Sequence, residues 1–334
     1  MKALVYLGPN TAAVKEVAEP VAKEGQIKLR VRYCGICGSD IGIYQGTHPR
    51  AKAPLILGHE FLGEVLQDGG KFRKGDRVVA YPLLSCGKCR PCRTGNAHVC
   101  NTLGLIGIDI DGGASQYVCA DEDVLFKVPD GVSDKAATVI EPLAVIIRAI
   151  HQSRLQSLDV TMVTGAGPIG LLTGIMLKHM GASKVMISDV NENRLKQAAA
   201  MGMIPVAAGD VKKAALDATD GDGVDILYEC SGAESVALQM TDFVRVGGTI
   251  CMVAQHKMPP KVNLRDLNFK EHIMVGTRVY TMDEFRQAVL YSAEICDELE
   301  KTVSHVVPLD DSPGVFAMID DPDSGTVKVL LDCN

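Results

Sequence analysis

The sequence predicts an α/β protein in which a β-rich N-terminal part precedes a doubly wound parallel sheet. A glycine-rich turn, Gly165-x-Gly167-x-x-Gly170, lies between an apolar strand and a helix. Strand-like and helix-like segments then alternate through the following region, which is typical of parallel sheets. Before this region, the segments "ALVYL", "QIKLRVRY", "DRVVA" and "ASQYVCA" have the pattern of short strands.

Length and composition restrict the class of protein. A chain of 334 residues usually holds two domains, and 47% hydrophobic with 22% charged residues excludes a disordered chain. A net charge of −7 without a long basic run argues against a nucleic-acid or membrane partner. The uncharged stretch 160–177 is interrupted by glycines and proline, so it predicts no membrane span. "MKALVYLGPN" lacks the signal-peptide pattern, and we expect a cytoplasmic protein.

The expected elements of the parallel sheet are apolar runs separated by polar or glycine-rich turns. Six strands are expected: at 160–164, in a segment ending at Asp189, near Ile204, in a segment ending near Tyr228, at "TICMVA" and at "EHIMVGTRVYT". Helices are expected from the glycine-rich turn to about Met180 and at 234–244, with "RVGG" as a turn before the fifth strand.

The glycine-rich turn predicts a dinucleotide site. Gly165 permits the tight turn, Gly167 lets the backbone approach a pyrophosphate, and Gly170 allows close packing of helix on strand. Asp189 follows nineteen residues after Gly170. A carboxylate there accepts hydrogen bonds from ribose hydroxyls and repels a 2′-phosphate, which favours NAD over NADP. Arg194 is a candidate contact for the same end of the cofactor, or else a solvated helix residue.

Four of the eleven cysteines lie close together, in the pattern Cys86-x2-Cys89-x2-Cys92-x7-Cys100. Without a signal-peptide pattern, such a cluster indicates a metal site rather than disulfides. Four thiolates are the ligands of a tetrahedral zinc ion. In the bacterial iron–sulfur run the fourth cysteine follows after three residues and precedes proline, which does not match this spacing. We therefore predict a structural zinc ion with no position left for substrate.

A second metal site is predicted from separate motifs. "YCGICGSD" contains Cys37, and "LGHEFLGEV" contains His59 and Glu60. One cysteine, one histidine and one carboxylate leave one position open, as in catalytic zinc sites. Because adjacent strand residues point to opposite faces, His59 and Glu60 can both bind only if the backbone turns there. Glu141 in "IEPLAVII" is another candidate carboxylate, or simply the first turn of a helix with Pro142 at the first helical position.

In this order the motifs resemble those of the zinc-dependent medium-chain dehydrogenases, especially the sorbitol, threonine and butanediol dehydrogenase branch. The resemblance covers nearly the whole chain and is carried by "GICGSD", "GHEFLGEV", "KGDRVVAYPLLSCGKCRPCRTGNAHVC", "EPLAV", "GAGPIG" and "GTRVYT". It implies a GroES-like catalytic domain at 1–142 and 277–334 and a Rossmann NAD-binding domain at 143–276. The active site would lie between them, in a homodimer or homotetramer.

The resemblance also implies roles for individual residues. Cys37, His59 and Glu60 would bind a catalytic zinc ion, and Glu141 would hold its water or act as an alternate ligand. One catalytic and one structural zinc ion are expected per chain. Beside the three glycines, the expected NAD contacts are Pro168, Ile169, Asp189, Arg194, Thr277, Arg278 and Val279. The candidates for the substrate pocket are Tyr44, Glu141, Arg278 and Tyr280.

The reaction that the resemblance implies is reversible oxidation of a secondary alcohol to a ketone, with hydride transfer to NAD. A polyol, sugar acid or cyclitol is the expected substrate. L-Threonine and a polyol phosphate are alternative substrates. Arg50, Arg148 and Arg278 are cations that leave an acidic or phosphorylated substrate as an option. A non-catalytic nucleotide-binding protein is the alternative from another class, and the complete zinc ligand set argues against it.

The chain departs from the family pattern at three places. Gly42 and Arg148 stand where many relatives have histidines, the first of which relays a proton, and the span 63–75 is a few residues short. Zinc lowers the pKa of bound water by about 9 units, roughly 12 kcal/mol, whereas a positioned general base contributes roughly 3–5 kcal/mol. We therefore expect slower or rerouted proton transfer rather than no activity, with Ser39 starting the relay and water, helped by Glu141, completing it.

Overall fold

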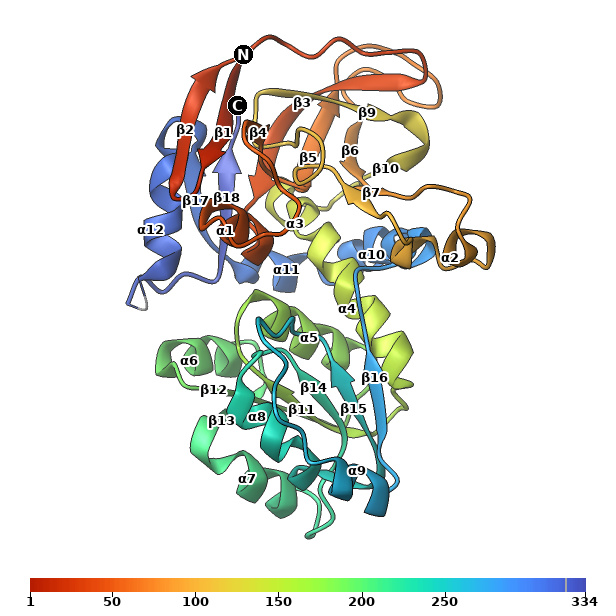
Figure 1. The fold of residues 1–334 in the computed structure, drawn as a ribbon, viewed down its shortest axis with the longest axis vertical. Coiled ribbons are helices and arrows are strands. Elements are labelled where there is room, and N and C mark those ends of the chain that lie inside the picture. The colour runs from red at the N-terminus through yellow and green to blue at the C-terminus, as the bar shows by residue number, and fades with distance from the viewer. Residues whose placement is uncertain (322) are drawn as a thin grey trace. The chain divides into compact units, whose positions relative to one another are not determined.

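The computed structural model describes residues 1–321 and 323–334 (Figure 1). The chain forms two units. The β-rich unit comprises Met1–Ala144 and Tyr280–Asn334, and the parallel-sheet unit comprises Val145–Val279. Among the helices in the described ranges, none has the length and apolar character that a membrane span requires.

The β-rich unit is built mainly on one sheet in the order β10-β6-β5-β3-β18-β17, with β9 also paired to β3. A three-stranded sheet, β2-β1-β4, and a pair, β7-β8, complete its β structure. The strands are β1 (Lys2–Gly8), β2 (Thr11–Glu16), β3 (Gln26–Gly35), β4 (Leu55–Ile56), β5 (Glu60–Val65), β6 (Arg77–Ala80), β7 (Leu83–Leu84), β8 (Gly104–Leu105), β9 (Tyr117–Asp121), β10 (Leu125–Lys127), β17 (Val303–Pro308) and β18 (Lys328–Asp332).

The ends of three strands meet in this sheet. Ile27, Leu29 and Val31 alternate along β3 as buried residues, as expected for a strand with one face in the core. β3 pairs antiparallel with both β5 and β18, so that Gly35, at its end, is opposite Glu60 on one side and Leu330 on the other. β18 lies between β3 and β17 and is buried over most of its length. This junction places residues from distant parts of the chain beside one another.

In the described ranges, seven α-helices belong to the β-rich unit, and one of them, α4, continues into the parallel-sheet unit. They are α1 (Gly38–Tyr44), α2 (Arg90–Arg93), α3 (Asp134–Thr138), α10 (Met282–Glu294), α11 (Cys296–Thr302), α12 (Val315–Asp320) and α4 (Ile140–Ser153). Pro142 is the third residue of α4 rather than the first, because the helix begins at Ile140 directly after α3 and its cap residue.

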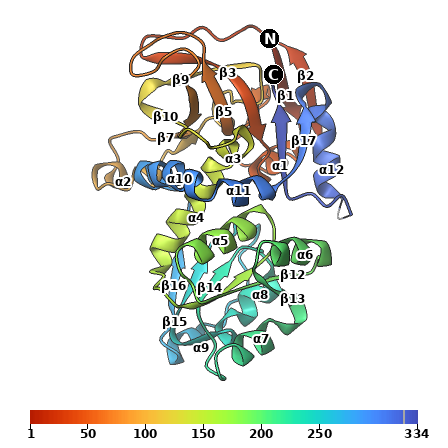
Figure 2. The same cartoon turned by 180° about the vertical axis from the view of Figure 1, so that it is seen from behind.

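The parallel-sheet unit has six strands in the order β13-β12-β11-β14-β15-β16, all parallel. Helices α5 and α6 cover one face of the sheet, and α7, α8 and α9 lie on the other (Figures 1 and 2). The predicted α/β class with a doubly wound parallel sheet is confirmed. Its elements are β11 (Val160–Thr164), α5 (Pro168–His179), β12 (Lys184–Asp189), α6 (Glu192–Ala200), β13 (Ile204–Ala207), α7 (Val211–Asp217), β14 (Val224–Glu229), α8 (Glu234–Gln239), β15 (Val244–Met252), α9 (Leu264–Phe269) and β16 (Ile273–Gly276).

Two local predictions for this unit were wrong. "RVGG" lies inside β15 and is not a separate turn, since Val244 already pairs with Val224. Gly247, with a φ of 70°, and a register shift in the pairing accommodate the glycines without ending the strand. The helix expected at 234–244 ends at Gln239 and continues only as a 3₁₀ turn, Met240–Asp242.

Candidate active site

Three of the predicted zinc ligands converge in the β-rich unit. Cys37 lies between β3 and α1, His59 precedes β5, and Glu60 is the first residue of β5. One ligand atom from each of them, a thiol sulfur, an imidazole nitrogen and a carboxylate oxygen, lies within 4.8 Å of the others. His59 and Glu60 are buried, and Cys37 is partly exposed. This geometry fits a single metal ion with three protein ligands.

The backbone turn that both ligands require is present. His59 lies in a bend, and the strand begins only at Glu60. The preceding Gly58 has a φ of 93°, and a Cβ atom there would overlap the Cys34 sulfur. Only glycine fits this turn, which brings the adjacent side chains of His59 and Glu60 to the same group.

Asp40 supports the ligand group without belonging to it. Its carboxylate, in the first turn of α1, accepts a hydrogen bond from the backbone N–H of Cys37 (2.8 Å). The other carboxylate oxygen lies 4.0 Å from Nδ1 of His59. Asp40 is fully buried, so this one side chain fixes the backbone of the first ligand and faces the ring of the second.

The electrostatics of the group fit a cation. Asp40 Oδ1 and His59 Nδ1 are buried and have no hydrogen-bond partner within the described chain. Burial alone would lower the pKa of His59, but the Cys37 thiolate and the carboxylates of Asp40 and Glu141 raise it well above its ordinary value. Acidic side chains gathered round a buried imidazole attract a cation, and a thiolate, imidazole and carboxylate set suits zinc.

Lys328 is a member of this site that the sequence analysis missed. Its side chain is 3% exposed and forms an ion pair with Glu60. The ammonium also donates a hydrogen bond to the backbone oxygen of Ile36 (3.0 Å). Burial opposes the charge on Lys328, yet Glu60 and the Cys37 thiolate raise its pKa. The available signal was a single lysine in the apolar segment "VKVLLD", where a charge needs a buried partner.

Glu141 and Tyr280, both predicted near the substrate, are bonded to each other. The Tyr280 hydroxyl donates a short hydrogen bond to Oε1 of Glu141, and both side chains are buried. Burial raises the pKa of Glu141 to about 7, and Glu60 adds to this effect, while His59 opposes it. The three-residue ligand group does not include Glu141.

The other predicted active-site residues have different surroundings. The Tyr44 ring stacks on Phe316, with ring centroids 4.1 Å apart. The Ser39 hydroxyl is buried and has no hydrogen-bond partner within residues 1–321 and 323–334. The Arg50 guanidinium bonds the Leu103 carbonyl oxygen and lies 3.4 Å from Asp109, so its charge is already paired.

The four clustered cysteines form a second ligand group. The sulfur of Cys89 lies 3.4 Å from that of Cys92 and 3.8 Å from that of Cys100. The backbone amides of Cys86 and Thr102 donate to the Cys100 sulfur and lower its pKa to about 6. Burial and the neighbouring thiols raise the pKa of Cys92 to about 11. Thiols packed this closely, with amides directed at one of them, fit a tetrahedral zinc ion.

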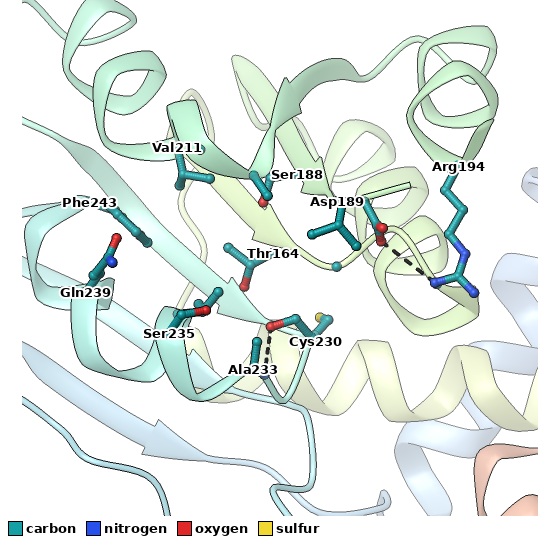
Figure 3. Close-up of a pocket in the computed structure, with 17 residues that line it drawn as sticks. Thr164, Ser188, Asp189, Arg194, Val211, Cys230, Ala233, Ser235, Gln239 and Phe243 are labelled. Atoms are coloured by element: carbon teal, nitrogen blue, oxygen red, sulfur yellow. Dashed lines mark hydrogen bonds and ion pairs between the residues drawn. The ribbon is translucent and has the colours of Figure 1, made fainter. Parts of the chain in front are cut away.

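The parallel-sheet unit contains a cavity of about 520 Å³ at the ends of β11, β12 and β14. Asp189 and Arg194 lie toward one end of it, and Gln239 and Phe243 lie toward the other (Figure 3). The residues that line it are Thr164, Gly165, Gly167, Ser188, Asp189, Val190, Arg194, Ala208, Gly209, Val211, Cys230, Ser231, Ala233, Ser235, Val236, Gln239 and Phe243.

The glycine-rich turn has the geometry that a dinucleotide needs. Gly165 has a φ of 94°, and a Cβ atom on Gly170 would overlap the Gly165 carbonyl oxygen. A Cβ atom on Gly167 would meet nothing within 4 Å, which leaves space for a phosphate near the start of α5. The Asp189 carboxylate accepts hydrogen bonds from the backbone amides of Ala166 (2.7 Å) and Asn191 (2.8 Å).

Some predicted cofactor residues do not line this cavity. Pro168 and Ile169 begin α5, and Thr277, Arg278 and Val279 follow β16. Arg148 faces the side-chain amide of Gln152 one turn further along α4. The wall from Cys230 to Phe243 was missed, although "ECSG" directly after the fourth predicted strand was a signal for it.

Comparisons with known proteins identify the family. Residues 23–130 match the alcohol dehydrogenase GroES-like domain, and residues 168–293 match the zinc-binding dehydrogenase domain. The chain is 34% identical to 2-dehydro-3-deoxy-L-galactonate 5-dehydrogenase of Pseudoalteromonas atlantica, with 100% of this chain and 99% of the relative covered. It is 35% identical to sorbitol dehydrogenase of Halalkalibacterium halodurans, with 99% of each covered.

Solved structures give the same result. The structure of 2R,3R-butanediol dehydrogenase from Bacillus subtilis superposes with a TM-score of 0.92 at 29% identity, covering 100% of this chain and 99% of that one. A zinc-binding dehydrogenase from Sinorhizobium meliloti bound to NADP has a TM-score of 0.92 at 29% identity over 99% and 98% of the two chains. A structure described as a short chain alcohol dehydrogenase from Escherichia coli, complexed with NADH, has a TM-score of 0.91 at 26% identity over 99% of each chain.

The resemblance noted in the sequence is thus confirmed at the level of domains, relatives and fold. With the thiolate, imidazole and carboxylate group, the four-cysteine loop and the nucleotide cavity, the chain belongs to the zinc-dependent medium-chain dehydrogenases, NAD(P)-dependent enzymes that act on small alcohols.

Proposed function

We propose that this protein oxidises a secondary alcohol of a polyol, sugar acid or cyclitol reversibly to the ketone, with NAD as hydride acceptor. The convergence of Cys37, His59 and Glu60 within 4.8 Å carries the proposal. Three protein ligands leave the fourth position of a tetrahedral ion for a substrate oxygen. A protein that only binds a nucleotide has no use for that open position.

Each part of the site has a task in this reaction. Zinc held by the three ligands would supply Lewis acidity that favours loss of the substrate's hydroxyl proton, and a bound nicotinamide would supply the acceptor for the hydride of the carbon that bears this hydroxyl. Asp40 holds the backbone of Cys37 in place, and Lys328 balances the charge of Glu60. The protein must then carry the released proton to solvent.

The proton path depends on what surrounds Gly42. His48 lies on the turn after α1, and its backbone amide donates to the Gly42 carbonyl oxygen (3.1 Å). Nδ1 of His48 accepts hydrogen bonds from the backbone amides of Arg50 (3.4 Å) and Ala51 (3.3 Å). It can take a proton at this nitrogen only by giving up both bonds, and burial and Arg50 lower its pKa. We therefore assign the first proton step to the buried hydroxyl of Ser39 and not to His48.

Ser39→Ala is expected to lower turnover by about tenfold or more, within the range of general acid–base contributions. The zinc content should stay unchanged, because Ser39 is not among the ligand groups. Ser39→Thr keeps a hydroxyl at this position and serves as the control. Steady-state turnover and metal analysis of both variants check the role, and unchanged turnover in Ser39→Ala would remove Ser39 from the proton path.

The cofactor preference is proposed from the charges at the ribose end of the cavity. Asp189 ends β12 and lines the cavity, so its carboxylate faces the position of an adenosine ribose in this fold. Arg194 Nη1 lies 3.9 Å from Asp189 and is held beside the carboxylate. Because the Asp189 carboxylate lines this end of the cavity and repels a 2′-phosphate, we propose NAD rather than NADP.

Asp189→Asn is expected to raise kcat/KM for NADP⁺ relative to NAD⁺ by at least about tenfold, because a like charge facing the phosphate costs several kcal/mol. The amide oxygen still accepts a hydrogen bond from Ala166, so the glycine-rich turn should remain intact. In Asp189→Asn/Arg194→Gln much of the gain should disappear, since no cation remains beside the phosphate. A preference for NADP⁺ in the parent protein would contradict the assignment.

The charges near the metal ligands favour an uncharged polyol over a phosphorylated substrate. Arg50 is paired with Asp109, and Lys328 is paired with Glu60. To bind at either of these two cations, a dianionic phosphate would have to displace its carboxylate partner. The polyol proposal is consistent with a sorbitol dehydrogenase among the relatives, and a sugar-acid substrate is consistent with the galactonate relative.

The experiment that tests the function is NADH formation by the zinc-loaded protein with a panel of alcohols. The panel should contain polyols, sugar acids, cyclitols, sugar phosphates, vicinal diols and L-threonine, each with NAD⁺ and NADP⁺. We expect turnover of a polyhydroxylated secondary alcohol with NAD⁺. No turnover in the presence of bound zinc and measurable NAD⁺ binding would contradict the proposed reaction and leave the fold assignment intact.

We also propose that the protein forms a homodimer or homotetramer. Apolar side chains are exposed around β16, which is an edge strand of the parallel sheet: Val246, Leu264, Phe269 and Ile273 are 46–75% exposed. A second copy that covers this edge would remove both the apolar surface and the unpaired strand from water. Sedimentation velocity of the purified protein measures the state, and a monomer at micromolar concentration would contradict this proposal.

A further inference from the structure

A buried carboxylate holds one wall of the nucleotide cavity in place. Glu229 is the last residue of β14 and is fully buried. Its Oε1 accepts three hydrogen bonds from the following turn: from the backbone amide of Ser231 (2.9 Å), from the Ser231 hydroxyl (2.5 Å) and from the backbone amide of Gly232 (2.9 Å). One carboxylate oxygen therefore fixes the turn 230–232.

The second oxygen of this carboxylate faces a histidine from another loop. Oε2 of Glu229 lies 3.3 Å from Nε2 of His256, whose side chain is 12% exposed. Both atoms are buried, and within the described residues neither has a hydrogen-bond partner, so each is the polar neighbour that the other faces. The backbone of Glu229 makes a related connection, because its carbonyl oxygen accepts bonds from the amides of Val253 (3.0 Å) and Ala254 (2.8 Å). Glu229 thus joins the loop after β15 to the turn after β14.

The turn 230–232 has little freedom to move without changing the cavity. A Cβ atom on Gly165 would lie 3.0 Å from both the Ser231 nitrogen and its Cα atom, so the turn passes directly against the first glycine of the nucleotide loop. Cys230 and Ala233 line the cavity (Figure 3), and Ser231 between them lines it too. A shift of this turn would therefore narrow or widen the space for the nucleotide.

We infer that Glu229 and His256 form a positioning pair that holds the turn 230–232 in the conformation required for binding the cofactor. Neither residue lines the cavity, so the pair acts through the wall and does not touch the reacting atoms. The inference rests on the proposed function only in requiring a nicotinamide dinucleotide, either NAD or NADP, in this cavity. A buried carboxylate that loses one partner takes up a new position or draws in water.

The test compares two replacements of His256, whose partial exposure makes both variants compatible with folding. His256→Leu removes the donor that faces Glu229, and His256→Gln retains an N–H group within similar reach. His256→Leu should raise the dissociation constant for NADH about tenfold, because the buried carboxylate oxygen of Glu229 then loses the polar group that faces it. His256→Gln should stay within about threefold of the parent. His305→Leu, in the β-rich unit, is the control for loss of a histidine elsewhere.

The measurements separate positioning from a general effect on stability. Fluorescence titration gives the dissociation constants of NADH and NADPH. Activity measured at saturating cofactor gives kcat, and calorimetry gives the thermal midpoint of unfolding. We expect His256→Leu to raise KM and Kd for the cofactor and to change kcat by less than about threefold. Equal dissociation constants in His256→Leu, His256→Gln and the parent would overturn the inference, as would a lower thermal midpoint with unchanged binding. A parent that binds neither nucleotide would contradict the cofactor proposal itself and with it this inference.

Discussion

Replacement of Cys37 by alanine is expected to reduce turnover by at least about 10³-fold and to remove one zinc ion from each chain. The thiolate is one of only three protein ligands in the group. Zinc lowers the pKa of a bound water by about 9 units, and the same effect on a substrate hydroxyl is the largest contribution to lowering the barrier, so its loss raises the barrier. His59 and Glu60 would remain, but one imidazole and one carboxylate bind zinc less tightly than a set that includes the thiolate.

Two measurements check this expectation. Metal analysis should give two zinc ions per chain in the parent and one in Cys37→Ala, because the four-cysteine loop is a separate group. Cys119→Ala, a thiol in β9 that belongs to neither group, should keep both ions and the parent turnover. Cys37→Ala with parental turnover would contradict the assignment of the active site, whatever its metal content.

Replacement of Lys328 by methionine is expected to destabilise the metal-free β-rich unit by about 3–5 kcal/mol. The side chain of Glu60 is 1% exposed, and Lys328 is its ion-pair partner. Removal of one member of a buried pair leaves the other charge without compensation, which costs more than the pair itself contributes. In Lys328→Met/Glu60→Gln no uncompensated charge remains, and most of the stability should return.

Thermal or urea unfolding of all three proteins, followed with and without zinc, checks this prediction. Because zinc and Lys328 both balance the charge of Glu60, zinc should stabilise Lys328→Met more than it stabilises the parent. The double variant reports the stability of the metal-free protein only, since Glu60 is also a predicted metal ligand. Equal stability of the parent and Lys328→Met, or a double variant weaker than the single one, would contradict the importance of the pair.

Features encoded by neighbouring residues could be predicted from the sequence. The four-cysteine loop and the glycine-rich turn each lie within a short segment, so their spacing alone specifies their geometry. Adjacent residues of a strand point to opposite faces, so His59 and Glu60 can bind one ion only if the backbone turns there. The bend after Gly58 provides this turn. The pairing of these ligands with Cys37 was predicted from the residue types in separate motifs and supported by the family resemblance, because residue spacing does not specify which loops meet.

Features that depend on strand register could not be predicted. The contact between Lys328 and Glu60 exists because β18 lies next to β3, whose other neighbour is β5. Nothing in "VKVLLD" specifies that order. For the same reason the glycines of "RVGG" predict a turn, although the pairing of Val244 with Val224 shows that the strand has already begun there. Arg50 was left open as a substrate contact because its partner Asp109 comes from a separate loop.

The position of β18 has a consequence for the order of events during synthesis. The strand that carries Lys328 is inserted between β3 and β17, and the whole parallel-sheet unit precedes it in the chain. The ribosome synthesises the chain from its N-terminus. All strands of the nucleotide-binding unit are therefore made before the β-rich unit can complete its main sheet. Until β18 arrives, Glu60 has no lysine to balance it. While the parallel-sheet unit is being made, the main sheet of the β-rich unit is incomplete. It has an unpaired strand edge and an unpaired buried carboxylate, and an unpaired edge favours aggregation.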